Sequence, residues 1–169
     1  VTVRTICADY FMEAPLHSND DEVTAKSFKV LERLLETAEA LKITDIVIPC
    51  VDQSSLKSKE AVVRFVDQIV KIIPRIERQN INLSLETDLP PKSFVELLDR
   101  LNSKNITVNY DIGNSAALGF DSDEELAAYG DKITDIHIKD RVLDGGPVTL
   151  GECNANFSKF FTKLKEFNY

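Results

Sequence analysis

Short apolar runs alternate along this chain with longer amphipathic stretches. The apolar runs are rich in β-branched residues and predict strands over 1–8, 45–51, 81–86, 106–111 and 133–139. Between them, apolar residues recur every three or four positions, which predicts helices over 24–42, 58–76, 90–101, 123–129 and 157–167. The acidic segment 9–22 is expected to form turns, with His17 on the surface.

The strict alternation of strands and helices predicts a parallel α/β sheet in a single domain over 1–169. Two architectures fit it, an open doubly wound sheet and a segment of a (β/α)₈ barrel. No Gly-x-Gly-x-x-Gly or Gly-Lys-Ser loop follows any of the strands, which disfavours the nucleotide-binding versions.

The net charge of the chain argues against one class of partner, nucleic acid. The chain carries 20 Lys and Arg against 28 Asp and Glu, a net charge of −8, and shows no basic cluster. Nucleic acid is therefore not expected as a partner, because phosphate neutralisation needs clustered cations. No apolar run approaches the roughly 20 residues of a membrane span, and no signal peptide is visible. We expect a cytoplasmic protein.

Cysteine usage agrees with a reducing compartment. Cys7, Cys50 and Cys153 are odd in number and widely spaced. Each is expected to act as a small buried apolar residue rather than as half of a disulfide or a zinc ligand.

Three successive strands end in a residue that can bind a metal ion. These residues are Glu86, Asp111 and His137. Because sites in parallel α/β folds form at the carboxyl edge of the sheet, the three side chains could meet there. Two carboxylates and one imidazole suit Mn²⁺, Mg²⁺, Zn²⁺ or Fe²⁺ better than a soft thiolate metal. Helix capping by the carboxylates and a structural histidine remain the alternative.

Four segments, 84–88 (SLETD), 110–114 (YDIGN), 135–140 (DIHIKD) and 150–152 (LGE), occur in that order. Together they resemble the sugar-phosphate isomerase/epimerase branch of the xylose-isomerase-like TIM barrels. The segment His-x-Lys-Asp followed by Leu-Gly-Glu is the most specific part. The loop that follows departs from the family pattern, with Cys153 in place of a glycine and Asn156 where Asp is common.

The resemblance implies a (β/α)₈ TIM barrel with one divalent cation at its mouth, the candidates being Mn²⁺, Mg²⁺, Zn²⁺ and Co²⁺. Its first three metal ligands match Glu86, Asp111 and His137, and a fourth, a glutamate, would follow Tyr169. A whole barrel needs about 250 residues, so we expect a partial barrel that lacks the first two strands and the last. Open edge strands invite pairing, which makes a homo-oligomer possible.

The implied activity is isomerisation or epimerisation of a sugar or sugar phosphate. A proton beside the ketose carbonyl is removed to give an enediolate, with Glu86 as both ligand and base. The residues expected to contact the substrate are Lys139, Arg141, Glu152, Asn114 and Asp9.

Other functions stay open. An inosose-type dehydratase or another lyase would use the same ligands, and a truncated barrel could be non-catalytic. An apurinic-site endonuclease is disfavoured, because a multi-metal cluster needs more than the two histidines present.

Overall fold

The computed structural model describes residues 2–167 and 169. Five parallel strands pair in sequence order into one sheet, and a two-stranded antiparallel hairpin follows. The strands of the sheet are β1 (Thr5–Cys7), β2 (Asp45–Cys50), β3 (Asn82–Thr87), β4 (Ile106–Asp111) and β5 (Ile133–His137). The strands of the hairpin are β6 (Asp140–Arg141) and β7 (Pro147–Val148).

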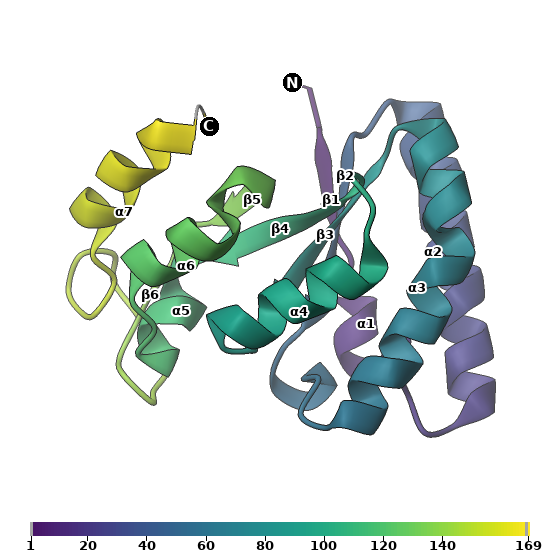
Figure 1. Ribbon diagram of the computed structural model, residues 1–169, viewed down its shortest axis with the longest axis horizontal. Coiled ribbons are helices and arrows are strands. Elements are labelled where there is room, and N and C mark those ends of the chain that lie inside the picture. The colour runs from purple at the N-terminus through teal and green to yellow at the C-terminus, as the bar shows by residue number, and fades with distance from the viewer. Residues whose placement is uncertain (1, 168) are drawn as a thin grey trace.

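Helices connect successive strands of the sheet, as Figure 1 shows. The α-helices are α1 (Tyr10–Glu13), α2 (Asp21–Leu41), α3 (Lys59–Gln79), α4 (Pro91–Leu101), α5 (Ile112–Leu118), α6 (Ser122–Tyr129) and α7 (Phe157–Leu164). Short 3₁₀ turns are η1 (Asp52–Ser54), η2 (Gly130–Lys132) and η3 (Lys165–Phe167). No helix within the described residues is both long and apolar enough to cross a membrane.

The sheet curls into part of a barrel. The hydroxyl of Thr5 on β1 donates a hydrogen bond of 2.7 Å to the carboxylate of Asp135 on β5. Since β1 and β5 are the outermost strands of the sheet, this contact requires strong curvature across β2, β3 and β4. The expected partial (β/α)₈ barrel is confirmed. That residues 1–169 form a single domain stays a prediction.

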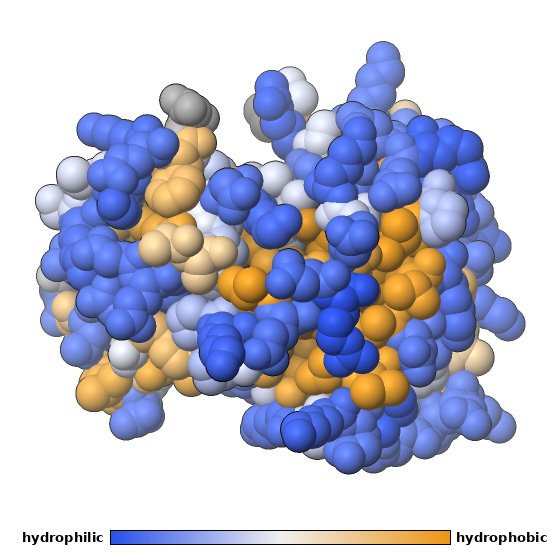
Figure 2. All heavy atoms as spheres, viewed as in Figure 1, coloured by the Kyte–Doolittle hydropathy of each residue, from blue (hydrophilic) through white to orange (hydrophobic). Residues whose placement is uncertain are grey.

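Capping residues and buried apolar faces explain why the predicted helices form, as α3 illustrates. The Ser58 hydroxyl accepts a hydrogen bond from the backbone of Ala61 and begins α3, as its position in the sequence suggests. The apolar face of α3 buries Phe65 and Ile69 against the sheet core, and the helix continues through Pro74 to Gln79. Figure 2 shows apolar side chains gathered on the face that carries α3 and α4.

Some predicted boundaries are wrong. The first strand is only Thr5–Cys7 within the described part of 1–8, because only these residues pair with β2. The segment 9–22 contains the short helix α1, and α5 begins directly at the end of β4 without a loop. The fifth strand ends at His137 rather than at residue 139.

Two expectations about burial are also wrong. Cys7 and Cys153 are exposed, and of the three free cysteines only Cys50 is buried. His17 is not on the surface, since only 7% of it is exposed. Its ring packs edge-on against Phe65 at a centroid distance of 6.0 Å, a tertiary contact that brings the loop after α1 onto α3.

Burial of His17 predicts a pH dependence of stability. Desolvation, aided by the nearby charge of Arg64, lowers the pKa of His17 to about 4. The unfolded chain therefore binds a proton that the folded chain excludes, so stability is present above about pH 6.5 and is lost as the pH falls toward 4. Between pH 7 and 5 we expect a loss of up to about 2 kcal/mol from this group.

Urea unfolding of wild type and His17→Gln at both pH values measures this effect. Carboxylates shared by the two proteins contribute equally, so the variant should lose less stability than wild type over the same interval. An equal loss in both proteins would contradict the assignment to His17.

Candidate metal centre

The carboxyl ends of β3, β4 and β5 bring Glu86, Asp111 and His137 together. One possible ligand atom from each lies within 4.8 Å of the others. Strand register explains the meeting, because Asp111 pairs directly with His137 across β4 and β5. Both carboxylate residues are buried at 5% exposure, whereas the imidazole is partly open to solvent. The sequence-based expectation that these three side chains meet agrees with this geometry, while their role as ligands stays a prediction.

The three side chains interact strongly. His137 Nδ1 lies 3.2 Å from Glu86 Oε2 and 3.6 Å from Asp111 Oδ2. Polar contacts with Asp111, Cys7 and Glu86 raise the pKa of His137 to about 12. With these neighbours the imidazole carries a proton at neutral pH, and a divalent cation that binds it must displace that proton.

Lys139 adds a positive charge to the cluster. Its Nζ lies 2.6 Å from Asp111 Oδ2 as an ion pair. Burial by itself raises the pKa of Asp111, but the contacts with His137 and Lys139 outweigh it and hold that pKa below its usual range. Gly113 makes room for this approach, because a Cβ there would lie 2.6 Å from Lys139 Cγ. Lys139, two residues beyond the end of β5, can therefore pass close to the start of α5 and reach Asp111.

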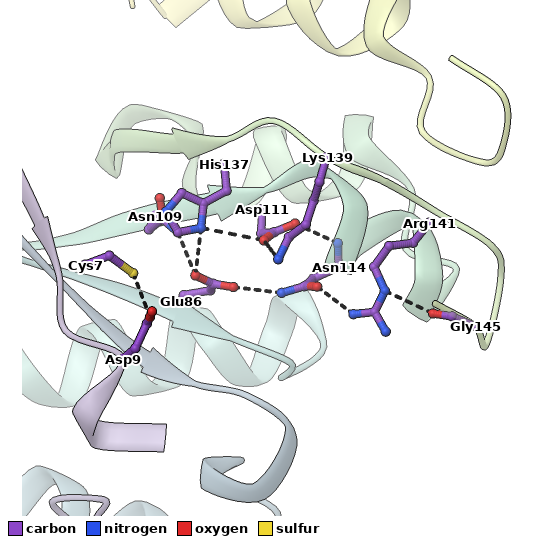
Figure 3. A network of polar contacts seen from close by, with 10 residues as sticks. All are labelled: Cys7, Asp9, Glu86, Asn109, Asp111, Asn114, His137, Lys139, Arg141 and Gly145. Carbon is purple, nitrogen blue, oxygen red and sulfur yellow. Dashed lines mark hydrogen bonds and ion pairs between the residues drawn. The ribbon is translucent and has the colours of Figure 1, made fainter. Parts of the chain in front are cut away.

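Asn114 and Arg141 form a chain of hydrogen bonds that ends on Glu86 (Figure 3). Arg141 donates to Asn114 Oδ1 at 2.7 Å and to the carbonyl of Gly145 at 3.0 Å. Asn114 Nδ2 donates to Glu86 Oε1 at 2.7 Å, and its backbone N–H donates to Asp111, which caps α5. Two residues predicted to contact substrate therefore also support the carboxylates.

Asp9 and Cys7 lie at the mouth end of β1. The Cys7 thiol donates to Asp9 Oδ1 at 3.1 Å. The hydrogen bond between Thr5 and Asp135 places β1 beside β5, and a polar contact with Cys7 helps to raise the pKa of His137. Sequence reasoning named Asp9 but not Cys7. The position of Cys7 near the end of a strand is the signal that could have found it.

The Glu152 side chain stands outside the hydrogen-bond network of the cluster, as far as the described residues show. It is exposed in the loop between β7 and α7 and makes no side-chain hydrogen bond or ion pair within the described residues. The loop itself is held by the buried carboxylate of Asp140, which accepts hydrogen bonds of 2.9–3.0 Å from four backbone N–H groups. Burial alone would raise the pKa of Asp140, but these hydrogen bonds lower it below its usual range.

The chemistry of the donor set fits a divalent cation. Asp111 Oδ2 is buried and, within the described residues, receives no well-aligned hydrogen bond, although the ammonium of Lys139 lies close. Two buried carboxylates and an imidazole provide the oxygen and nitrogen donors that Mn²⁺, Mg²⁺, Zn²⁺ and Co²⁺ accept. The cluster could therefore hold such an ion.

The protein is a partial α/β barrel, with a curled parallel sheet and helical crossovers. Its candidate site is the carboxylate–imidazole cluster at the carboxyl ends of the strands, which form the mouth of the barrel. The sequence profile of the xylose isomerase-like TIM barrel family matches residues 1–169. The chain belongs to this family, and the resemblance seen in its motifs is confirmed.

Curated relatives match the whole chain. It is 26% identical over 187 residues to the putative L-ribulose-5-phosphate 3-epimerase SgbU of Haemophilus influenzae, covering 100% of this chain and 64% of SgbU. It is 27% identical over 178 residues to the L-ribulose-5-phosphate 3-epimerase UlaE of Escherichia coli K12, covering 100% of this chain and 62% of UlaE. The chain thus spans less than two thirds of the length of these relatives.

Solved structures share the fold. A D-tagatose 3-epimerase-like protein matches with a TM-score of 0.75 and 21% identity, over 99% of this chain and 79% of that one. The IolI protein, whose structure contains a bound zinc atom, matches with a TM-score of 0.76 and 18% identity, over 90% of this chain and 60% of that one. At these identities the likeness establishes the architecture.

Proposed function

We propose that this chain carries the metal-binding part of a sugar or sugar-phosphate isomerase/epimerase that acts on a ketose. The observation that carries the proposal is the meeting of Glu86, Asp111 and His137 at the carboxyl ends of three adjacent strands. The names of the curated relatives support it and favour a ketopentose 5-phosphate among the possible substrates.

Glu86, Asp111 and His137 would hold one divalent cation, with Mn²⁺, Mg²⁺, Zn²⁺ and Co²⁺ as candidates. When bound, such a cation supplies Lewis-acid stabilisation of the negative charge that develops on the substrate oxygens. The Lys139 ammonium balances the charge of Asp111, which lies 2.6 Å away.

Glu86 is the proposed base. Its carboxylate takes the proton beside the ketose carbonyl, which requires hydrogen-bond reach to that proton. Return of a proton to the opposite face of the same carbon gives epimerisation, and return to the neighbouring carbon gives isomerisation. The residues proposed to orient substrate oxygens are Lys139, Arg141, Asn114, Glu152 and Asp9.

The proposal also covers the partner, the compartment and the assembly of the protein. A net charge of −8 supports a small-molecule partner rather than nucleic acid. The three free cysteines agree with residence in the cytoplasm. A single domain over 1–169 and a homo-oligomer are part of the same proposal.

Proton exchange with solvent tests the function. The longest natural polypeptide that carries this chain is incubated with Mn²⁺ and ketopentoses, free and 5-phosphorylated, in D₂O. We expect an epimer or aldose isomer that carries solvent deuterium at the reacting carbon, and loss of the reaction on adding a chelator. A product that has lost water would indicate a dehydratase, and no turnover of any ketose would contradict the proposal.

A further inference from the structure

Both oxygens of Glu86 are held by asparagine side chains. Asn114 Nδ2 donates to Oε1 at 2.7 Å, and Asn109 Nδ2 donates to Oε2 at 2.8 Å. All three residues are buried, with exposed fractions of 9%, 2% and 5% for Asn114, Asn109 and Glu86. Figure 3 shows the two amides on opposite sides of the carboxylate. Because each oxygen has its own donor, the plane of the carboxylate cannot rotate without breaking a buried hydrogen bond.

Asn109 reaches a second member of the cluster. It lies two residues before Asp111 on β4, so the two side chains point to the same face of the sheet. Asn109 Nδ2 is 3.1 Å from His137 Nδ1 as well as 2.8 Å from Glu86 Oε2. One amide nitrogen on β4 thus donates to the carboxylate from β3 and lies beside the imidazole from β5.

The orientation of the Asn109 amide follows from its neighbours. The opposite rotamer would place its oxygen against the carboxylate of Glu86, two acceptors with no proton between them. The donor must therefore face Glu86. A neutral donor also stabilises the carboxylate without adding a charge that would compete with a cation.

We propose that Asn109 is a positioning residue that fixes Glu86 relative to His137 before the cation binds. The inference rests on the proposed function for the identity of the cation, but the clamp itself concerns only side chains of this chain. Groups that orient metal ligands are typically worth 10–100-fold in metal affinity, because an unheld ligand must be ordered at the moment of binding.

Asn109 is a cleaner test of the clamp than Asn114. The Asn114 side chain also accepts from Arg141, and its backbone lies in the first turn of α5, so replacing it changes several contacts at once. The described contacts of the Asn109 side chain, in contrast, go only to Glu86 and His137.

The experiment compares Asn109→Leu with Thr107→Val. Thr107 lies on the same face of β4, is buried at 6% exposure, and hydrogen-bonds Thr134 at 2.8 Å, away from the cluster. Mn²⁺ titration by calorimetry should show that Asn109→Leu weakens binding about 10–100-fold, whereas Thr107→Val binds like wild type. Thermal unfolding without added metal should show similar losses of stability in both variants. Mn²⁺ affinity that is unchanged in Asn109→Leu, or lowered equally in Thr107→Val, would overturn the proposal.

A second readout needs no metal. In wild type, NMR should show the Asn109 side-chain amide protons protected from exchange with water, and Glu86→Gln should remove that protection. Rapid exchange in wild type would overturn the clamp. If wild type bound no Mn²⁺ while the protected amide was present, the proposed function would fail and the clamp would stand, so the two failures are distinguishable.

Discussion

Replacing Glu86 by glutamine should lower the turnover of a ketose by about 10²–10⁴-fold, the usual contribution of a positioned acid or base. Glutamine keeps the shape of the side chain but cannot take the proton. It also places an NH₂ group against one of two amide donors, since Asn109 and Asn114 each donate to one oxygen of Glu86. The variant should therefore lose both its proton acceptor and one of the hydrogen bonds that orient the side chain.

The measurement is kcat and solvent deuterium incorporation at saturating Mn²⁺, so that a weaker metal site does not hide the role in proton transfer. Glu125→Gln is the matched control. Glu125 is another buried glutamate, at 3% exposure, but it accepts hydrogen bonds from Tyr110 and Tyr129 away from the cluster. Its replacement should reduce stability and leave turnover at the wild-type level. Full turnover in Glu86→Gln would eliminate Glu86 as the base.

Removing the imidazole of His137 should abolish Mn²⁺ binding at this site. His137 Nδ1 lies 3.2 Å from Glu86 Oε2 and 3.6 Å from Asp111 Oδ2, so its loss removes the nitrogen donor that both carboxylates share. We expect His137→Ala to weaken Mn²⁺ binding by more than about 100-fold, beyond the effect of residues that only support a ligand. The same loss should remove the thermal stabilisation that Mn²⁺ gives wild type, because a ligand stabilises only the state that binds it.

Calorimetry with chelator-treated protein measures the affinity. The chain has one other histidine, and His17→Gln is therefore the matched control, since His17 packs against Phe65 outside the cluster. It should bind Mn²⁺ like wild type. Unchanged binding in His137→Ala would show that the metal site lies elsewhere in the protein.

The strands of the sheet could be predicted because their signal is local, whereas their order followed from the family resemblance, since an open doubly wound sheet fitted the same alternation. Each strand after the first is a short run of β-branched and apolar residues between helical patterns, and each pairs with its neighbour in sequence. The short helix α1 gave no such signal, because four residues are too few to show helical periodicity. Burial of His17, in the loop after α1, depends on Phe65 on α3, and no pattern around position 17 reports that contact.

The cluster of Glu86, Asp111 and His137 could be predicted from the sequence because of the geometry of parallel sheets. Strands that are parallel and adjacent end at one edge, so Glu86, Asp111 and His137 meet without any detailed knowledge of packing. The contacts of Asn109 depend on side-chain rotamers and on the register of β3, β4 and β5. Alternation along β4 could have placed Asn109 on the face of Asp111, but not the direction of its amide.

The hydrogen bond between Thr5 and Asp135 has a consequence for how the chain folds. Pairing of neighbouring strands closes only one helical connection at a time, whereas this contact joins residues 130 positions apart. Loop-closure entropy makes so distant a contact slow to form. We therefore expect the sheet to assemble strand by strand from local nuclei, with the contact between its two outermost strands forming last.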